Sequence, residues 1–220
     1  MTTRAEFRSV LRETLTDRAI WPDTLLNIWI NNAIQDYSNY FPRRAETTLA
    51  CVAAQRVYSL TALSGIQGIL AVEYPKDESP PRYLARRPET GSFLDLPVYD
   101  VRGDPPLSLV IGESPAAAEE IWVAYACDHT TPSTDSTALT VPDKHLEALK
   151  LFVIWQAVRE LELTEAADRA GTEMLLSLLG LNSVRAERLY RNRIDDYAKK
   201  AAAPGGYAGP WVADDHDRIY

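Results

Sequence analysis

Residues 143–161, DKHLEALKLFVIWQAVREL, form the segment that decides the fold. At helical spacing one face carries Leu146, Leu149, Val153, Ala157 and Leu161, and Phe152, Ile154, Trp155 and Val158 surround that face. An apolar surface this wide has to be covered from more than one side. We therefore expect this helix to lie at the centre of a helical domain and to find its partners elsewhere in the chain.

The first partner is predicted at the N-terminus, as a helix over about Thr3–Arg18. Thr3 and Glu6 have the spacing of a capping box, in which the hydroxyl accepts a first-turn amide and the carboxylate reaches back. The apolar stripe of this helix consists of Phe7, Val10, Leu11 and Leu15.

A second helix is predicted over about Asp23–Phe41. Pro22 suits the entry to a helix, Asp23 can cap it, and Pro42 ends it because proline lacks the amide donor. The expected buried face consists of Leu26, Trp29, Ile30, Ala33, Tyr37, Tyr40 and Phe41.

Between these helices and the central one, the period changes to that of β-strands. Short runs rich in β-branched and aromatic residues alternate with turn clusters such as Pro80-Pro81. The predicted strands are Val57–Leu60, Ile69–Tyr74, Arg82–Leu84, Val98–Val101, Leu107–Ile111 and Ile121–Cys127. Strands of this number and spacing predict a small antiparallel sandwich or barrel.

The fold expected is therefore α+β, with a helical bundle split by an inserted β domain, because neither helical part carries enough apolar surface to fold alone. Further helices are predicted from Thr164 to about Leu179 and, capped by Asn182 or Ser183, over Val184–Lys200. The expected parts are residues 1–48 (helical, first part), 49–140 (β), 141–203 (helical, second part) and 204–220 (an extended tail).

The composition of the chain excludes or disfavours several classes of function. The formal net charge of −8 disfavours general affinity for nucleic-acid backbones, although an acidic wall beside sliding DNA stays compatible with it. No run approaches the length of a membrane span, and the N-terminus lacks the apolar core of a signal peptide. Cys51 and Cys127 are expected to be reduced core thiols.

No motif with catalytic chemistry is visible. His129, His145 and His216 lack metal-ligand spacing, and His145 is expected to be an exposed first-turn residue. Phosphate-binding glycine loops and a nucleophile elbow are missing, and adjacent acids such as Asp195 and Asp196 point to different helix faces. We therefore predict no enzymatic activity, no catalytic residue, no cofactor and no metal.

The last helix and the tail offer candidates for partner binding. The arginines of Val184–Lys200 suit either a strip facing nucleic acid or a solvated face with local ion pairs. The tail combines glycines and prolines with large apolar and aromatic residues, in which disordered tails are poor and binding hot spots are rich. Its acidic residues would complement a basic partner surface. It either folds back on its own subunit or docks on a neighbour. Its predicted partner-binding residues are Tyr207, Trp211, Val212, Asp214, Asp215, Ile219 and Tyr220, with Asp217 beside them.

The whole pattern resembles the head-to-tail adaptor (connector) proteins of tailed bacteriophages, most closely those of short-tailed, podovirus-type phages. The resemblance covers about Thr3–Leu179. It rests on Trp21-Pro22-Asp23 leading into Leu26, Trp29-Ile30-Asn31, Ala33-Ile34, Asp36-Tyr37 and Tyr40-Phe41-Pro42, on Gln55–Leu60, Ile69–Tyr74 and Ile121–Tyr125, and on Val141-Pro142-Asp143 before the Glu147-Ala148-Leu149 helix.

The resemblance implies a virion structural protein of the neck, made in the host bacterial cytoplasm. It implies a homo-oligomeric ring, commonly of about twelve copies, beneath the portal protein. Such a ring extends the DNA channel, touches DNA only as non-specific passage during genome ejection, and gives the tail or nozzle protein a docking platform, with no membrane partner. The tail would then reach the portal. Another tail-completion or baseplate component, or a hydrolase with a β lid, stays open as an alternative.

Overall fold

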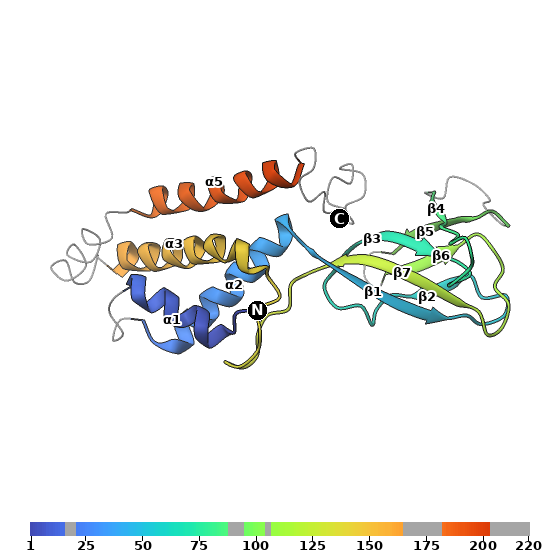
Figure 1. Cartoon of the computed structure of the whole chain (residues 1–220), viewed down its shortest axis with the longest axis horizontal. Helices are drawn as coiled ribbons and strands as arrows, with labels where there is room; N and C mark the ends of the chain where they lie inside the picture. Colours follow the sequence, from blue (N-terminus) through green and yellow to red (C-terminus); the bar gives the residue numbers. More distant parts are fainter. Residues whose placement is uncertain (16–20, 88–94, 104–106, 165–181, 203–220) are drawn as a thin grey trace. The chain divides into compact units, whose positions relative to one another are not determined.

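The structure is a computed structural model that describes residues 1–15, 21–87, 95–103, 107–164 and 182–202. Within these ranges it contains four α-helices, one short 3-10 helix and two β-sheets, which confirms the α+β class (Figure 1). The described residues divide into a helical unit, residues 1–41 with 129–202, and a β unit, residues 42–128. These limits differ from the expected β segment of residues 49–140. Predictions for Thr164–Leu179 fall almost wholly outside the described residues.

The helical unit contains α1 (Arg4–Leu15), α2 (Asp23–Tyr40), η1 (Asp143–His145), α3 (Leu146–Thr164) and α5 (Ser183–Ala202). At the start of α1 the predicted capping box is confirmed, since the Thr3 amide donates to Glu6 Oε2 at 2.7 Å and the Glu6 amide donates to Thr3 Oγ1 at 3.3 Å. The hydrogen bonds that the Thr3 amide and hydroxyl donate to the Glu6 carboxylate lower the pKa of that carboxyl. At α5 Asn182 provides the cap, with Oδ1 accepting from the Arg185 amide at 2.8 Å.

The predicted cap at Asp23 is wrong. Pro22 is the N-cap of α2, and no side chain caps that helix. The Asp23 carboxylate instead binds the guanidinium of Arg12 and lies 3.5 Å from Nε of Arg8. The hydrogen bond from Arg12 lowers the pKa of Asp23. The first residue of α2 thus joins this helix to α1, because two arginines of α1 lie within reach of its side chain.

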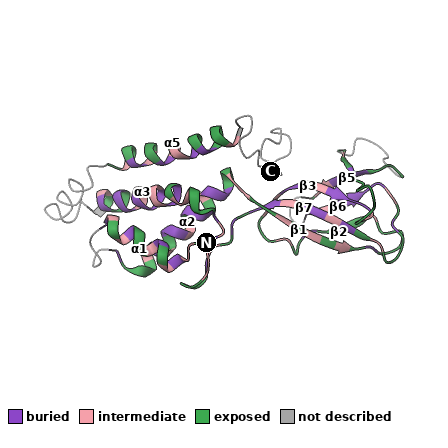
Figure 2. Cartoon of the chain, viewed as in Figure 1, coloured by how far each residue is buried: buried purple, intermediate pink, exposed green. Residues whose placement is uncertain are grey.

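The central helix α3 is buried as predicted. It packs against α1, α2 and α5, and Figure 2 shows buried residues on several of its sides. Its interior side chains share one core with the other helices: Phe7, Leu11, Leu26, Ile30, Ile34, Leu149, Val153, Val158, Tyr190 and Ile194 are members. The segments of residues 1–41 and 129–202 therefore close one core together.

Three residues of the expected buried faces lie nearer the surface. Val10 and Tyr40 are both 43% exposed, and Trp155 is only partly buried at the margin of the core. Each sits at the edge of an apolar stripe, where helical periodicity does not decide between core and rim.

The residues after His129, which were expected to belong to the β part up to residue 140, are bound to the start of α1. Thr3 and Ala138 form an antiparallel bridge, and the Leu139 amide donates to the Thr2 carbonyl at 2.9 Å. Asp135 accepts hydrogen bonds from Arg4 and Arg8, which lower the pKa of its carboxyl to about 2. This segment therefore belongs to the helical unit, a role that its Ser/Thr-rich composition conceals.

The β unit holds two sheets. One has three strands in the order β1-β7-β3 and the other four in the order β2-β6-β5-β4. The strands are β1 (Arg43–Ala50), β2 (Val57–Ser59), β3 (Ile66–Glu73), β4 (Ala85–Arg86), β5 (Val98–Arg102), β6 (Ser108–Ile111) and β7 (Glu120–Cys127). Among the described residues neither sheet closes into a barrel. Side chains of both sheets share one core, including Tyr58, Val72, Tyr99, Leu109, Ile111, Ile121 and Val123.

Two expectations for the β unit are corrected. Strand β1 lies largely in a stretch that was assigned to the helical part up to residue 48. Its exposed and half-buried residues alternate, but of the half-buried ones only Leu49 is large and apolar. The unit is also not antiparallel throughout, since β4 pairs with β5 in parallel, at Ala85 with Val98. Cys51 and Cys127 are buried and unbridged.

Candidate partner-binding surface

The seven tail residues predicted to bind a partner, Tyr207, Trp211, Val212, Asp214, Asp215, Ile219 and Tyr220, lie outside the described residues. Their role stays a prediction. His216 lies in the same segment. The surfaces that can be built from described side chains are on α5, the helix that leads into this segment, and on the β unit.

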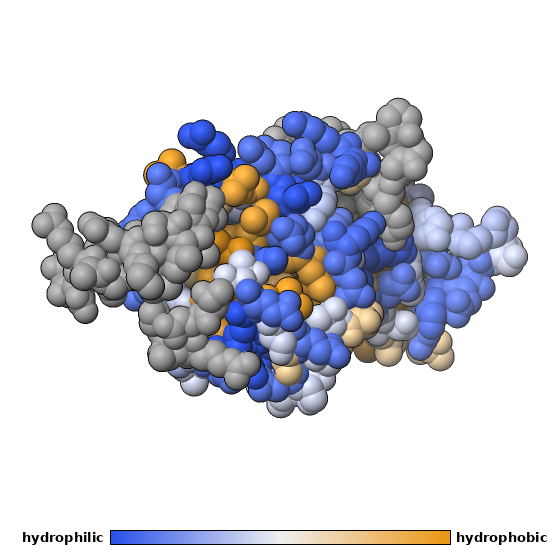
Figure 3. All heavy atoms as spheres, turned by 60° about the vertical axis from the view of Figure 1, so that its left-hand side comes forward, coloured by the Kyte–Doolittle hydropathy of each residue, from blue (hydrophilic) through white to orange (hydrophobic). Residues whose placement is uncertain are grey.

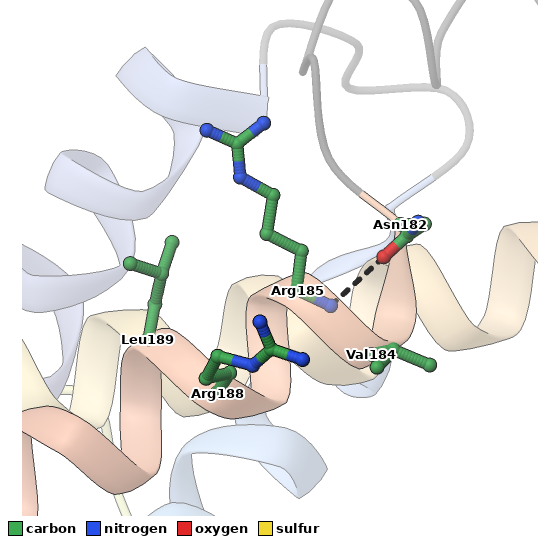
Figure 4. A pocket seen from close by; sticks show the side chains of 5 residues that line it. All are labelled: Asn182, Val184, Arg185, Arg188 and Leu189. Atoms are coloured by element: carbon green, nitrogen blue, oxygen red, sulfur yellow. Dashed lines mark hydrogen bonds between the residues drawn. The ribbon is translucent and has the colours of Figure 1, made fainter.

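An open hollow of about 500 Å³ lies at the start of α5 and is lined by Asn182, Val184, Arg185, Arg188 and Leu189. Figure 4 shows these side chains along the first turns of the helix, with Asn182 bonded to the Arg185 amide. Sequence reasoning missed the hollow, although Val184 and Arg188 are one turn apart and so share a helix face.

The same end of the helical unit presents apolar side chains to solvent. Leu163 is 67% exposed near the end of α3, and on α5 Val184 is 65% and Leu189 41% exposed. The Ser183 amide donates to Glu162 Oε1 at 2.8 Å, which holds the start of α5 against the end of α3. Figure 3, with this end turned forward, shows apolar surface beside residues that the structure does not describe.

Further along α5, Arg191 belongs to an aromatic stack. Its guanidinium lies 5.4 Å from the Tyr190 ring centre and 5.9 Å from that of Trp155, and it lies 3.7 Å from Asp36 Oδ2. The Tyr190 hydroxyl also donates to Asp36, and burial together with that carboxylate raises the pKa of Tyr190. For Arg191 the structure thus favours local pairing over a strip that faces nucleic acid.

A histidine and aromatic cluster lies where α2, η1 and α5 meet. The His145 ring stacks on Tyr197 with centroids 4.2 Å apart, and its Nδ1 is hydrogen-bonded to the Tyr37 hydroxyl. Burial, with smaller effects of Lys144 and His129, lowers the pKa of His145 to about 4. The expectation that His145 is simply exposed is therefore wrong, because the aromatic residues that cover it come from distant segments.

His129 also has a structural role. It is 6% exposed, its amide donates to Ser38 Oγ at 2.9 Å, and its ring nitrogens contact Thr140 Oγ1 and the Phe41 carbonyl. These contacts fix the start of the second helical segment against the end of α2. The ring is thus engaged in packing rather than offered to a ligand.

Tyr74 and Glu119 form a tyrosine–carboxylate pair in the β unit, with the hydroxyl donating to Glu119 Oε2. That hydrogen bond lowers the pKa of Glu119, while burial raises the pKa of Tyr74. The Ala116 amide donates to the same oxygen at 2.9 Å, so the carboxylate holds a turn in place.

In the described ranges, no three His, Cys, Asp or Glu side chains could together hold a metal ion. The same ranges contain no helix with the length and apolarity to cross a bilayer.

The described residues thus form a split helical unit and a two-sheet unit, with exposed apolar side chains at the start of α5. Residues 2–210 match the model of the SU10 adaptor protein family, and the chain belongs to this family. A comparison with curated proteins found no match. The family match confirms the predicted identity as a phage head-to-tail adaptor, whereas the specific likeness to short-tailed phages stays a prediction.

Proposed function

We propose that this chain is a subunit of the head-to-tail adaptor ring that lies beneath the portal and receives the tail or nozzle protein. The family match over residues 2–210 carries the proposal, because it spans both units rather than one of them. A phage adaptor is a structural component of the virion that interacts with head and tail components. Beyond this role, we propose that the subunits form a ring with a defined copy number, that the ring binds the portal, and that the tail or nozzle protein docks on it.

The ring follows from the task of such a protein. A DNA channel requires subunits arranged about the DNA axis, and head-to-tail contacts that close give cyclic symmetry. We propose about twelve copies per virion. The negative formal charge of −8 suits a channel in which DNA slides without sticking. Within each subunit, the helical unit would form a helical bundle and the β unit an inserted β-sandwich.

The tail, residues 204–220, is proposed to reach out of the subunit and dock on the portal. Its prolines and glycines disfavour a long helix, while Trp211 and Tyr220 are of the types enriched at binding hot spots. Asp214 and Asp215 would face basic residues of the partner. Ordering such a segment on binding has an entropic cost, so the docked state needs these anchors.

A reconstruction of the virion tests the assignment. We expect this chain as a ring directly below the portal, with the tail or nozzle attached to its far side. Density for the chain in a fibre or on the capsid shell would contradict the proposal.

Deletion of residues 204–220 tests the tail. The shortened protein should keep its fold and melting temperature but fail to attach to capsids that carry the portal. A matched control replaces only Asp214 and Asp215 by Asn, which should weaken attachment more at low than at high salt. A shortened protein that melts several degrees lower yet still attaches would show that the tail packs on its own subunit.

A further inference from the structure

Helix α1 presents an exposed face on which an apolar residue lies between two acidic ones. Glu6, Val10 and Glu13 follow one another at intervals of about one turn, so they share a face of the helix. All three are exposed, and Val10, which was expected in the buried stripe, is 43% exposed. The Glu6 carboxylate is engaged in the capping box, where it accepts from the amide and the hydroxyl of Thr3. Among the described residues, the Glu13 carboxylate has neither a hydrogen bond nor an ion pair.

The first turns of α5 present the complementary pattern. The hollow of about 500 Å³ is lined there by apolar Val184 and Leu189, which are 65% and 41% exposed. Arg188 lines the same hollow one turn after Val184 and is also exposed (Figure 4). Within the described ranges, the Arg188 guanidinium makes no hydrogen bond, no ion pair and no contact with an aromatic ring. The hollow therefore combines apolar walls with an unpaired cation.

The two faces lie on different sides of the helical unit. Figure 1 shows α1 and α5 on opposite sides of α3, and both helices contact α3. The exposed face of α1 therefore cannot reach the hollow on α5 of its own subunit. Between two copies it can, and a contact that joins two different faces is of the head-to-tail kind that closes into a ring.

We propose that the exposed face of α1 in one copy docks in the hollow on α5 of a second copy, with Val10 against Val184 and Leu189. Glu13 then pairs with Arg188. This inference rests on the proposed ring. The occupant follows from charge complementarity, because the hollow carries an unpaired cation and the face of α1 carries an unpaired carboxylate. On each helix the charged residue lies about one turn from the apolar one, so both contacts can form together.

The contact is small, which suits assembly on a template. One valine in an open hollow buries little apolar surface, and an exposed ion pair contributes little by itself. Isolated copies should therefore stay monomeric at low concentration. Copies held side by side on a portal have a high effective concentration and can form all the contacts of a ring together.

Reversing one charge at a time tests the ion pair. Glu13→Lys places a second cation beside Arg188 of the next copy, and Arg188→Glu places a second anion beside Glu13. Each variant should keep its melting temperature, because both side chains are exposed. Each should assemble on portal-bearing capsids about tenfold less well, because the repulsion recurs at every contact of the ring.

An equal mixture of the two variants shows whether the pair joins two copies. In a ring where the variants alternate, the substituted position 13 meets the substituted position 188, and Glu13 meets Arg188 at the next contact. The mixture should therefore assemble although neither variant does so alone. A pair within one chain would be restored only by both substitutions in the same chain, and that result would overturn the proposal.

Matched controls reverse exposed charges at the other end of α5. Asp196→Lys and Lys199→Glu lie two turns or more beyond the hollow. Both should assemble like the original chain. A loss as large as that of Arg188→Glu would show that the overall charge of α5, and not the proposed pair, controls assembly.

Cross-linking tests the apolar part of the contact. The double variant Val10→Cys with Val184→Cys, bound to portal-bearing capsids and mildly oxidised, should give a ladder of covalent multimers. The control, Val10→Cys with Val57→Cys, places the second thiol on β2, where Val57 is 52% exposed, and should give none.

The outcomes separate the inference from the proposed function. If the original chain forms a ring but both charge variants assemble normally and the Val10/Val184 pair gives no ladder, the contact is wrong and the ring stands. If the original chain forms no ring, the proposed function fails and this inference fails with it. Cross-linking of position 184 to the portal protein would also overturn the contact. If a charge variant does not fold, the cysteine pairs alone decide.

Discussion

The core of the helical unit draws on residues as far apart as Phe7 and Tyr197, whereas the buried residues of the main β core all lie between Cys51 and Val123. The β unit can therefore complete its core from one continuous stretch of chain. The helical unit has to bring together two segments that the whole β unit separates. Closing so long a loop costs entropy before any contact is gained, so the helical core needs large, well-packed side chains.

The largest expected effect is on the helical core. Tyr190 is fully buried and packs edge-on against Phe152, with centroids 5.3 Å apart. Tyr190→Ala should lower the free energy of unfolding of this unit by about 3–5 kcal/mol. Hydrogen exchange by mass spectrometry should show faster exchange in α3 and α5, with β7 unchanged.

Trp155→Ala is the matched control. If Trp155 were a core residue, the loss would be of similar size, but it lies at the margin of the core, so we expect about 1–2 kcal/mol. Equal losses for the two variants would show that Trp155 is more deeply packed than the structure indicates.

The reciprocal change is in the β core. Leu109 on β6 is fully buried, and Leu109→Ala should cost about 2–4 kcal/mol in the β unit alone. The readout is again exchange, now faster in β2, β5 and β6. If either variant opens both units together, the comparison between a split and a continuous core fails, because the two would then unfold as one.

A pH titration sharpens the comparison, because His145 belongs to the helical unit. Its folded pKa is about 4, below the usual value of 6.5, so the unfolded chain takes up the proton first as pH falls. The helical unit should lose stability between pH 6.5 and 4, by about 1–2 kcal/mol once partial exposure is allowed for. Urea unfolding at stepped pH, with His145→Gln as the non-titrating control, measures this. If the free energy of unfolding of His145→Gln falls with pH as steeply as that of the original chain, other titrating groups cause the loss.

The smallest expected effect concerns the segment after His129. Arg8 and Arg4 lower the pKa of exposed Asp135 to about 2, so its contribution to stability is present above pH 3.8 and is lost as pH falls towards 2. Asp135→Asn should slightly lower the melting temperature at neutral pH and remove that acid dependence. Arg4 and Ala5 should then exchange faster. Faster exchange in β1 instead would contradict the assignment of this segment to the helical unit.

Elements with a strong apolar period were predicted well. The central helix, the capping box of α1 and most strands followed from residue spacing, since those residues face one core. Strand β1 could not be predicted this way, because its half-buried positions are held by Ala45 and Thr47 as well as Leu49, and small or polar residues there give no clear apolar alternation in the sequence. The surface hollow was also missed, although all of its lining residues lie on α5 or directly before it, because helical periodicity gives the face of a residue and not the shape of the surface.

The sequence by itself determined the α+β class, the order of helical and β segments and the absence of recognisable catalytic motifs, because these depend on local periodicity and residue type. Only the tertiary structure decided that Asp23 binds Arg12 rather than capping α2 and that the His145 ring stacks on Tyr197. These properties depend on contacts between residues that are far apart in the sequence. Only the folding of the chain decides which of those residues come into contact.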